Sequence, residues 1–194
     1  MVESPLADYQ IRYLVGSLSS ASINRSLATA LIRLAPDNLE FTEIPISGLP
    51  LYNRDVDEDL PPSAKELKRS IEAADALLFI TPEYNRGVPG VLKNAIDWGS
   101  RPAGQNSWAK KPSAVIEAST GKIGTALAQQ SLRGSLTFVN VPQMSAPEGY
   151  IQMVPGLIGE DGEITDPSTE EFLRTFMSRY EQFVSRVLTV LPHS

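Results

Sequence analysis

The stretch from Ala76 to Trp98 reads A-L-L-F-I-T-P-E-Y-N-R-G-V-P-G-V-L-K-N-A-I-D-W and combines three local patterns. Its first part, Leu77 to Thr81, is an apolar run with the composition of a buried strand, and it stops at Pro82. A loop of planar polar residues and glycines follows, and then apolar residues recur at helical spacing up to Trp98. In an open α/β sheet, ligands bind at the carboxyl ends of the strands, so this stretch predicts a binding site.

The same alternation of strand and helix runs through the chain. Apolar and alternating patterns predict further strands at residues 11–15, 39–46, 112–118 and 136–141. Apolar spacing predicts helices at residues 23–34, 63–74 and 121–133, and a last helix that starts near Asp166. Ser22 is the expected cap of the first helix, and Ser63 and Glu66 have the spacing of a capping box in the second. Residues 150–154 and 159–164 have the pattern of a small hairpin.

Strands that alternate with helices need crossover connections, and these favour parallel pairing. The expected architecture is therefore α/β: a five-stranded parallel sheet with helices on both faces. The 194 residues, 42% of them hydrophobic, suffice for one domain with a substantial core, so we expect a single domain over residues 1–194.

Charge and the N-terminal sequence exclude several partners. A net charge of -6 argues against a nucleic-acid surface, which would be basic. The first ten residues lack a signal-peptide core, and no apolar run approaches the length of a membrane span. We therefore expect a cytoplasmic protein with no nucleic-acid or membrane partner.

Catalysis by cysteine, histidine or a protein-bound metal is not expected. The chain has no cysteine, which excludes thiolate nucleophiles and Cys-ligated zinc. His193 is the only histidine and lies two residues from the end of the sequence, where a polar tail is the simpler interpretation. The acids between Asp55 and Asp59 lack the glycine and terminal glutamate of an EF-hand loop and are interpreted as a solvated loop. We name no catalytic side chain and no metal site.

The turn after the first strand is suited to an anion. It reads G-S-L-S-S-A-S from Gly16 to Ser22 and opens the first helix, whose N-terminal N–H groups and dipole favour a phosphate. The polar side chains available there are those of Ser17, Ser19, Ser20, Ser22 and Asn24. Because the turn has neither a Walker A ending nor Gly-x-Gly-x-x-Gly, ATP and a Rossmann-bound dinucleotide are not expected. A serine-rich turn that merely caps the helix is the alternative.

Three segments carry a resemblance to a known family. They are G-S-L-S-S-A-S-I-N-R-S-L-A at residues 16–28, L-P-L-Y-N-R-D at residues 49–55 and T-P-E-Y-N-R-G-V-P-G-V-L-K-N-A-I-D-W at residues 81–98; the likeness extends through A-S-T-G-K-I-G at residues 118–124. Together they resemble the NADPH-dependent FMN reductases, which include bacterial quinone, chromate and azo-dye reductases. The resemblance implies a flavodoxin-like, three-layer fold, non-covalently bound FMN, NADPH or NADH as co-substrate, and assembly as a homodimer or homotetramer. Tyr52, Trp98 and Trp108 are candidate aromatic residues for such assembly, although packing in the core or in a loop is the favoured interpretation of each.

The resemblance also implies which residues bind FMN. The first loop would hold the phosphate, the second would wrap the flavin largely through backbone groups, and the third would border the isoalloxazine ring. The implied residues are Ser17, Ser19, Ser22, Ile23 and Asn24 in the first loop, Pro82, Glu83, Tyr84 and Asn85 in the second, and Ser119, Thr120, Gly121 and Lys122 in the third.

One departure from the family concerns the charge that faces the phosphate. Family members often carry a basic residue where this chain has Ser19, and a charge-assisted contact is roughly twice as strong as a neutral one. Arg25 and Lys122 are the candidates to compensate. A lysine beside the flavin ring would also stabilise the reduced anion and raise its potential.

The expected function is hydride transfer from NAD(P)H, through FMN, to a quinone-like, azo, chromate or free-flavin acceptor. Since flavin carries the redox chemistry, the lack of cysteine and histidine clusters is compatible with an enzyme. The first alternative is a flavodoxin-type electron carrier, which would stabilise one-electron-reduced flavin and oxidise little NAD(P)H. The second is a non-catalytic binding module, which would purify without FMN. Arg86 and Gly87 depart from the usual pair at the mouth of the pocket, and Arg86 and Arg101 are candidates to select NADPH by its 2′-phosphate.

Overall fold

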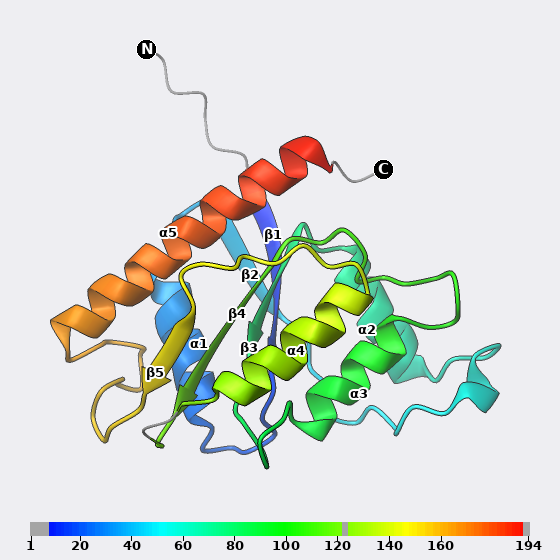
Figure 1. Ribbon diagram of the computed structural model, residues 1–194, viewed down its shortest axis with the longest axis horizontal. Helices are drawn as coiled ribbons and strands as arrows, with labels where there is room; N and C mark the ends of the chain where they lie inside the picture. The colour runs from blue at the N-terminus through cyan, green and yellow to red at the C-terminus, as the bar shows by residue number, and fades with distance from the viewer. Residues whose placement is uncertain (1–7, 122–123, 192–194) are drawn as a thin grey trace.

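The computed structural model describes residues 8–121 and 124–191, which form a five-stranded parallel sheet between layers of helices (Figure 1). The strands are β1 (Tyr9–Val15), β2 (Leu39–Glu43), β3 (Ala76–Ile80), β4 (Ser113–Ser119) and β5 (Gly149–Gln152), and their order is β2-β1-β3-β4-β5. From β1 the sheet grows first to β2 on one side and then through β3 to β5 on the other. This is the flavodoxin-like order, which confirms the predicted fold class and puts the switch point between β1 and β3.

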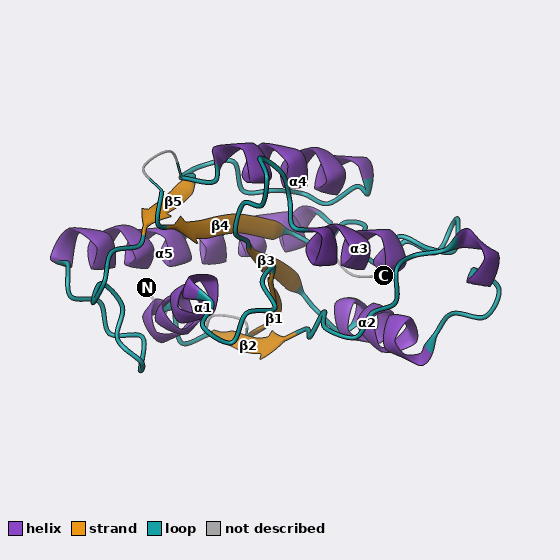
Figure 2. Cartoon of the chain, turned by 90° about the horizontal axis from the view of Figure 1, so that it is seen from below, coloured by secondary structure: helices purple, strands orange, loops and turns teal. Residues whose placement is uncertain are grey.

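The helices divide the core into two halves. α1 (Ile23–Leu34) and α5 (Pro167–Val190) cover one face of the sheet, and α2 (Pro62–Glu72), α3 (Gly90–Gly99) and α4 (Ala126–Phe138) cover the other (Figure 2). Side chains alternate between the two faces, so Leu78 packs with the first set of helices and Leu77 with the second. Every residue of β3 is buried, because helices cover this central strand on both sides. A short 3₁₀ helix, η1 (Arg54–Val56), lies in the loop before α2.

The helix caps agree with the sequence at two places and differ at a third. Ser22 caps α1, its Oγ accepting the N–H of Arg25 at 3.4 Å, and Asp166 caps α5. The capping box predicted for α2 is wrong. That helix begins at Pro62 with no side-chain cap, because proline at the first position already has a helical φ and no N–H to satisfy. Ser63 thus falls inside the first turn.

The fifth strand also differs from the prediction. A strand at residues 136–141 is wrong because α4 continues to Phe138 and buries Leu136 at helical spacing. The fifth strand is instead β5, in the segment expected to form a hairpin, and its residues are alternately buried and exposed. What remains of that hairpin is one antiparallel bridge between Ile158 and Ile164. Five strands are therefore present, but the last one lies later in the sequence than predicted.

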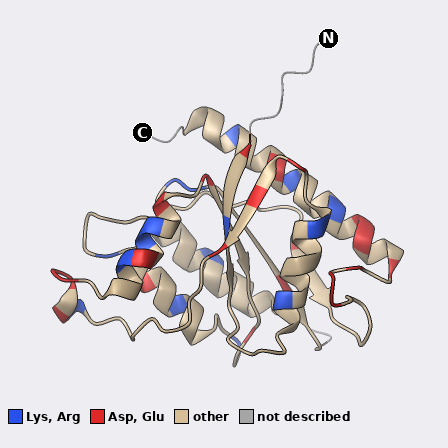
Figure 3. Ribbon diagram, turned by 180° about the vertical axis from the view of Figure 1, so that it is seen from behind, with Lys and Arg blue, Asp and Glu red and all other residues tan. Residues whose placement is uncertain are grey.

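The two tryptophans belong to the core. Trp98 and Trp108 are fully buried, and the ring of Tyr52 meets Trp98 edge-on with 5.1 Å between centroids. Trp98 and Trp108 are therefore not available for contacts with another subunit. On the outside, Lys and Arg are interspersed with Asp and Glu along α2 and α5 (Figure 3). Among the described residues, no helix has both the length and the apolar character needed to span a membrane.

Candidate functional site

The carboxyl ends of β1, β3 and β4 meet at one edge of the sheet, the lower edge in Figure 1. A pocket of about 260 Å³ opens there, next to the switch point. It is lined by Ser17, Ser19, Ala21, Ser22, Ile23, Asn24, Pro82, Glu83, Tyr84, Ala118, Ser119, Thr120 and Thr125. Residues from three loops that are distant in the sequence thus share one pocket, as the sequence predicts.

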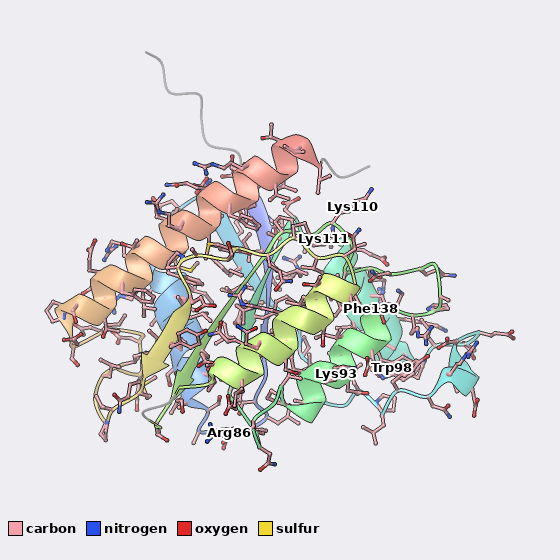
Figure 4. All side chains as sticks on the ribbon, viewed as in Figure 1. Arg86, Lys93, Trp98, Lys110, Lys111 and Phe138 are labelled. Atoms are coloured by element: carbon pink, nitrogen blue, oxygen red, sulfur yellow. The ribbon has the colours of Figure 1, made fainter. Side chains whose placement is uncertain are left out.

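A larger cavity, of about 540 Å³, lies at the opposite edge, near Lys110 and Lys111 at the top of Figure 4. Its buried ammonium groups already have partners. Lys68 Nζ donates to the Gln105 carbonyl at 2.5 Å and to Ser107 Oγ at 2.8 Å, and Lys111 Nζ donates to the Ala74 carbonyl at 2.5 Å. These lysines bind backbone carbonyls at the ends of helices and loops. Size alone therefore does not make this cavity the better candidate site.

The first loop is held close to β3. A Cβ on Gly16 would lie 2.7 Å from Thr81 Oγ1, so only glycine fits where the chain leaves β1. Ser17 Oγ lies 3.4 Å from Tyr84 Oη and accepts the N–H of Ser19 at 3.4 Å. These contacts join the serine turn to the second loop and leave the first N–H groups of α1 facing the pocket.

The side chain of Asn24 is not free to bind a phosphate, because it already makes two hydrogen bonds. Its Nδ2 donates to the Ala118 carbonyl at 3.0 Å, and its Oδ1 accepts the Ala118 N–H at 2.8 Å. The side chain is buried and fixes the start of α1 to the end of β4. Asn24 lines the pocket, and the donor it has left for a ligand is its backbone N–H.

The second loop makes a tight turn. Tyr84 and Gly87 exchange backbone hydrogen bonds of 3.1 Å, and Asn85 and Arg86 between them have positive φ angles of 51° and 65°. Asparagine tolerates this conformation well, whereas arginine adopts it at a cost. Arg86 lies at the lower edge of the molecule in Figure 4, and Asn85 is not among the residues that line the pocket.

Glu83 joins this loop to the third one. Its Oε2 accepts the N–H groups of Leu127 and Ala128, both at 3.1 Å, at the N-terminus of α4. A carboxylate there satisfies two N–H groups that have no partner within the helix and interacts favourably with the helix dipole. Arg86 pairs with the other oxygen of Glu83 at 3.5 Å. The side chain of Glu83 therefore positions α4, and Glu83 also lines the pocket.

The third loop follows β4. Ser119 and Thr120 line the pocket, and Ser119 Oγ accepts the N–H of Gly121, which is not a lining residue. Lys122 lies outside the described residues. Thr125 lines the pocket although the sequence does not suggest it. The sequence predicts a helix from residue 121, which would place Thr125 inside it. In the structure α4 begins at Ala126, so Thr125 belongs to the loop.

The hydrogen-bond donors that the described residues offer to the pocket are neutral. Arg25 points away from it, because its Nη1 forms an ion pair with Glu43 Oε2 at 2.7 Å, and this hydrogen bond raises the pKa of Arg25. Arg101, the second candidate for NADPH selection, lies over the ring of Tyr52 at 5.5 Å and lines a different cavity. Within residues 8–121 and 124–191, no Lys or Arg lines the pocket, and no group of three or more acidic or histidine side chains could hold a metal. A phosphate there would be bound by hydroxyl and N–H groups.

One strongly perturbed acid lies behind the pocket wall. Glu117 on β4 is completely buried, and burial is the main cause that raises its pKa to about 8. The nearby carboxylate of Glu83 raises the pKa further, whereas the N–H of Thr125 and the amide of Gln129 lower it. Glu117 does not stand out in the sequence, since one acid inside an apolar strand gives no motif.

Comparison with known proteins agrees with this geometry. Residues 9–155 match the family described as NADPH-dependent FMN reductase. The chain is 47% identical to a 2-hydroxy-1,4-benzoquinone reductase of a Burkholderia species over 90% of this chain and 96% of the relative, and 45% identical to a quinone reductase of Pseudomonas putida over 91% and 95%. Among solved structures, the flavoenzyme NAD(P)H:(acceptor) oxidoreductase FerB from Paracoccus denitrificans superposes with a TM-score of 0.88 at 46% identity, over 92% of this chain and 98% of that one. The chain belongs to the NADPH-dependent FMN reductase family.

Proposed function

We propose that this chain is an NAD(P)H-dependent oxidoreductase that binds FMN non-covalently in the pocket at the switch point and reduces quinone-like acceptors. The observation that carries the proposal is the meeting of the loops after β1, β3 and β4 at the N-terminus of α1. A quinone is the favoured acceptor because the relatives named above include a benzoquinone reductase and a quinone reductase. Azo compounds, chromate and free flavin are further acceptors to test.

The serine turn fits the phosphate end of FMN. Ser17, Ser19 and Ser22 contribute hydroxyl groups, and Ile23 and Asn24 contribute N–H groups in the first turn of α1. A helix N-terminus with free N–H groups and a favourable dipole binds phosphate without a cation. The hydrogen-bond donors of these residues therefore fit the FMN phosphate. Because this chain has Ser19 where family members often carry a basic residue, phosphate binding depends on these neutral contacts.

The second and third loops fit the flavin. Pro82, Glu83 and Tyr84 from the second loop and Ser119 and Thr120 from the third all line the pocket, and we expect backbone groups of these loops to contact the flavin. Asn85, Gly121 and Lys122 extend the two loops in the sequence. Bound FMN supplies the hydride-transfer chemistry. The protein has to bind it by its edges, orient it and leave one face open to NAD(P)H and then to the acceptor.

We also propose that the chain forms a homodimer or homotetramer through α3 and α4. Phe138 at the end of α4 is 90% exposed, and Leu127 on the same helix is also exposed. Lys93 on α3 lies beside this helix in Figure 4. A large exposed apolar side chain next to charged residues suits a contact between subunits. Sedimentation of the wild type and of Phe138→Ser tests this: a monomeric wild type contradicts the assembly.

The test of the enzyme is an absorbance spectrum followed by anaerobic addition of NADPH. We expect a yellow protein whose flavin band bleaches in one two-electron step and returns on addition of a benzoquinone. Little NADPH oxidation, with a one-electron-reduced species during reductive titration, would favour the electron carrier. A colourless protein that takes up no added FMN would contradict the proposal.

A further inference from the structure

A buried carboxyl group lies directly behind the wall of the pocket. Glu117 precedes Ala118 and Ser119, both of which line the pocket, and its side chain points to the opposite side of β4, toward α4. One carboxyl oxygen, Oε1, accepts the N–H of Thr125, another lining residue. The other oxygen, Oε2, has no hydrogen-bond partner among the described residues. Glu117 is thus in contact with the pocket wall without lining it.

Three buried polar atoms near the start of α4 lack partners in the described part of the chain. They are Glu117 Oε2, Thr125 Oγ1 and Gln129 Oε1. Gln129 Nε2 already donates to the Gly149 carbonyl at 2.7 Å, which leaves its Oε1 without a donor. An ionised carboxylate has no proton to offer Gln129 Oε1, whereas a neutral acid has one O–H donor and keeps its other oxygen to accept the backbone N–H of Thr125. Buried polar groups are costly unless they are paired.

The charges around this group also disfavour ionisation. Glu83, from the loop after β3, is the acid that interacts with it, and it occupies the neighbouring N–H groups of α4. Tyr150 on β5 interacts with Glu117, and burial and the acid Glu148 raise the pKa of this phenol. The guanidinium of Arg133 on α4 donates to the Met144 carbonyl at 3.0 Å. Within the described residues, no cation pairs with the Glu117 carboxyl.

We propose that Glu117 is a positioning residue of the FMN pocket: a neutral acid that bridges Thr125 and Gln129 and so holds the start of α4 against the carboxyl end of β4. The inference rests on the proposed function, because it assumes that the pocket holds FMN. Ionisation would remove the O–H donor and face a second negative charge toward Glu83. We therefore expect the pocket wall at Thr125 to loosen, and the affinity for FMN to fall, as the pH rises through about 8.

The test is the dissociation constant of FMN, measured by flavin fluorescence from about pH 6 to about pH 10. The wild type should lose about tenfold in affinity with a midpoint near pH 8, which corresponds to a one-unit difference in the Glu117 pKa between free and FMN-bound protein. Glu117→Gln keeps a neutral side chain of the same shape at every pH and should lack this midpoint. Because both proteins bind the same FMN phosphate, its own titration cancels in the comparison. Tyr150→Phe should keep the midpoint, since the tyrosine titrates at higher pH.

Infrared spectroscopy of the wild-type holoenzyme provides a second measurement that needs no variant. A carbonyl stretching band of a protonated carboxyl group should be present at neutral pH and disappear near pH 8. Absence of that band at neutral pH, an FMN affinity that does not change across this range, or the same midpoint in Glu117→Gln would overturn the inference. Failure of the wild type to bind FMN at any pH would instead contradict the proposed function.

Discussion

Asn24 on α1 and Ala118 on β4 exchange two hydrogen bonds, with Asn24 Nδ2 donating to the Ala118 carbonyl and the Ala118 N–H donating to Asn24 Oδ1. These residues are 94 positions apart in the sequence. The pair joins the first turn of α1, the helix at the proposed phosphate end of the pocket, to the strand that leads into the third loop. One buried amide therefore sets the relative position of two walls of the site.

The first prediction is that Asn24→Ala lowers both stability and FMN affinity. The change leaves a buried N–H and a buried carbonyl of Ala118 without partners, which costs about 2–4 kcal/mol in the free energy of unfolding. Urea denaturation of the flavin-free protein measures this loss. Thr29→Ala on the same helix removes only an exposed side-chain hydrogen bond and should stay within about 0.5 kcal/mol of the wild type. Equal effects of the two changes would contradict the role of the Asn24 pair.

The second prediction concerns the charge at the phosphate end. Ser22→Asp and Ser22→Asn both keep a good helix cap, so neither should change the free energy of unfolding by more than about 0.5 kcal/mol. Only the aspartate brings a negative charge next to a phosphate dianion, and with no basic residue lining the described pocket there is little to offset the repulsion. We expect Ser22→Asp to weaken FMN binding by roughly 100-fold and Ser22→Asn by less than about tenfold. Equal dissociation constants would place the phosphate elsewhere.

The third prediction uses a glycine that has room in the protein. Among the described residues, a Cβ on Gly121 would meet only Ser119 Oγ, at 3.5 Å, which is an ordinary contact. Gly121→Ala and then Gly121→Val should therefore leave the folded protein intact and lower FMN affinity stepwise, because the added groups occupy space beside the flavin ring. Thermal unfolding of the flavin-free variants and FMN titration separate the two effects. Wild-type affinity in the valine variant would mean that Gly121 does not contact the cofactor.

Most of the fold and the site's location could be predicted, because both depend on local patterns. A buried strand ending at Pro82 and a serine turn that leads to the helix cap Ser22 are visible in the sequence, and parallel order brings their ends together. The fifth strand was not predictable in the same way. Gly149 to Gln152 is only four residues long, and Leu136 has an apolar character that suits either a strand or the helix it forms.

Side-chain partners that are distant in the sequence could not be predicted either. The sequence gives Asn24 as a phosphate donor and Glu83 as a loop residue, but the first binds Ala118 and the second binds the N-terminus of α4. Arg25 is a reasonable candidate for a missing charge until Glu43, on a strand at the sheet edge, is seen to pair with it. Such partners depend on how helices and strands pack against one another, and the residue spacing within one helix or strand does not indicate them.

The last prediction is a pH dependence of stability due to Glu117. The folded-state pKa of this acid is raised to about 8 from 4.5, so the stability linked to its neutral form is fully present below about pH 4.5 and is lost as the pH rises through about 8. Between these limits the folded state binds more protons than the unfolded state, and the free energy of unfolding should fall by at most about 1.4 kcal/mol for each pH unit. Urea denaturation of flavin-free wild type and Glu117→Gln at several pH values measures the difference, in which other titrating groups cancel. The two curves should diverge between about pH 4.5 and about pH 8 and run parallel above that range. Curves that are parallel throughout would mean that Glu117 is ionised in the folded protein already at neutral pH.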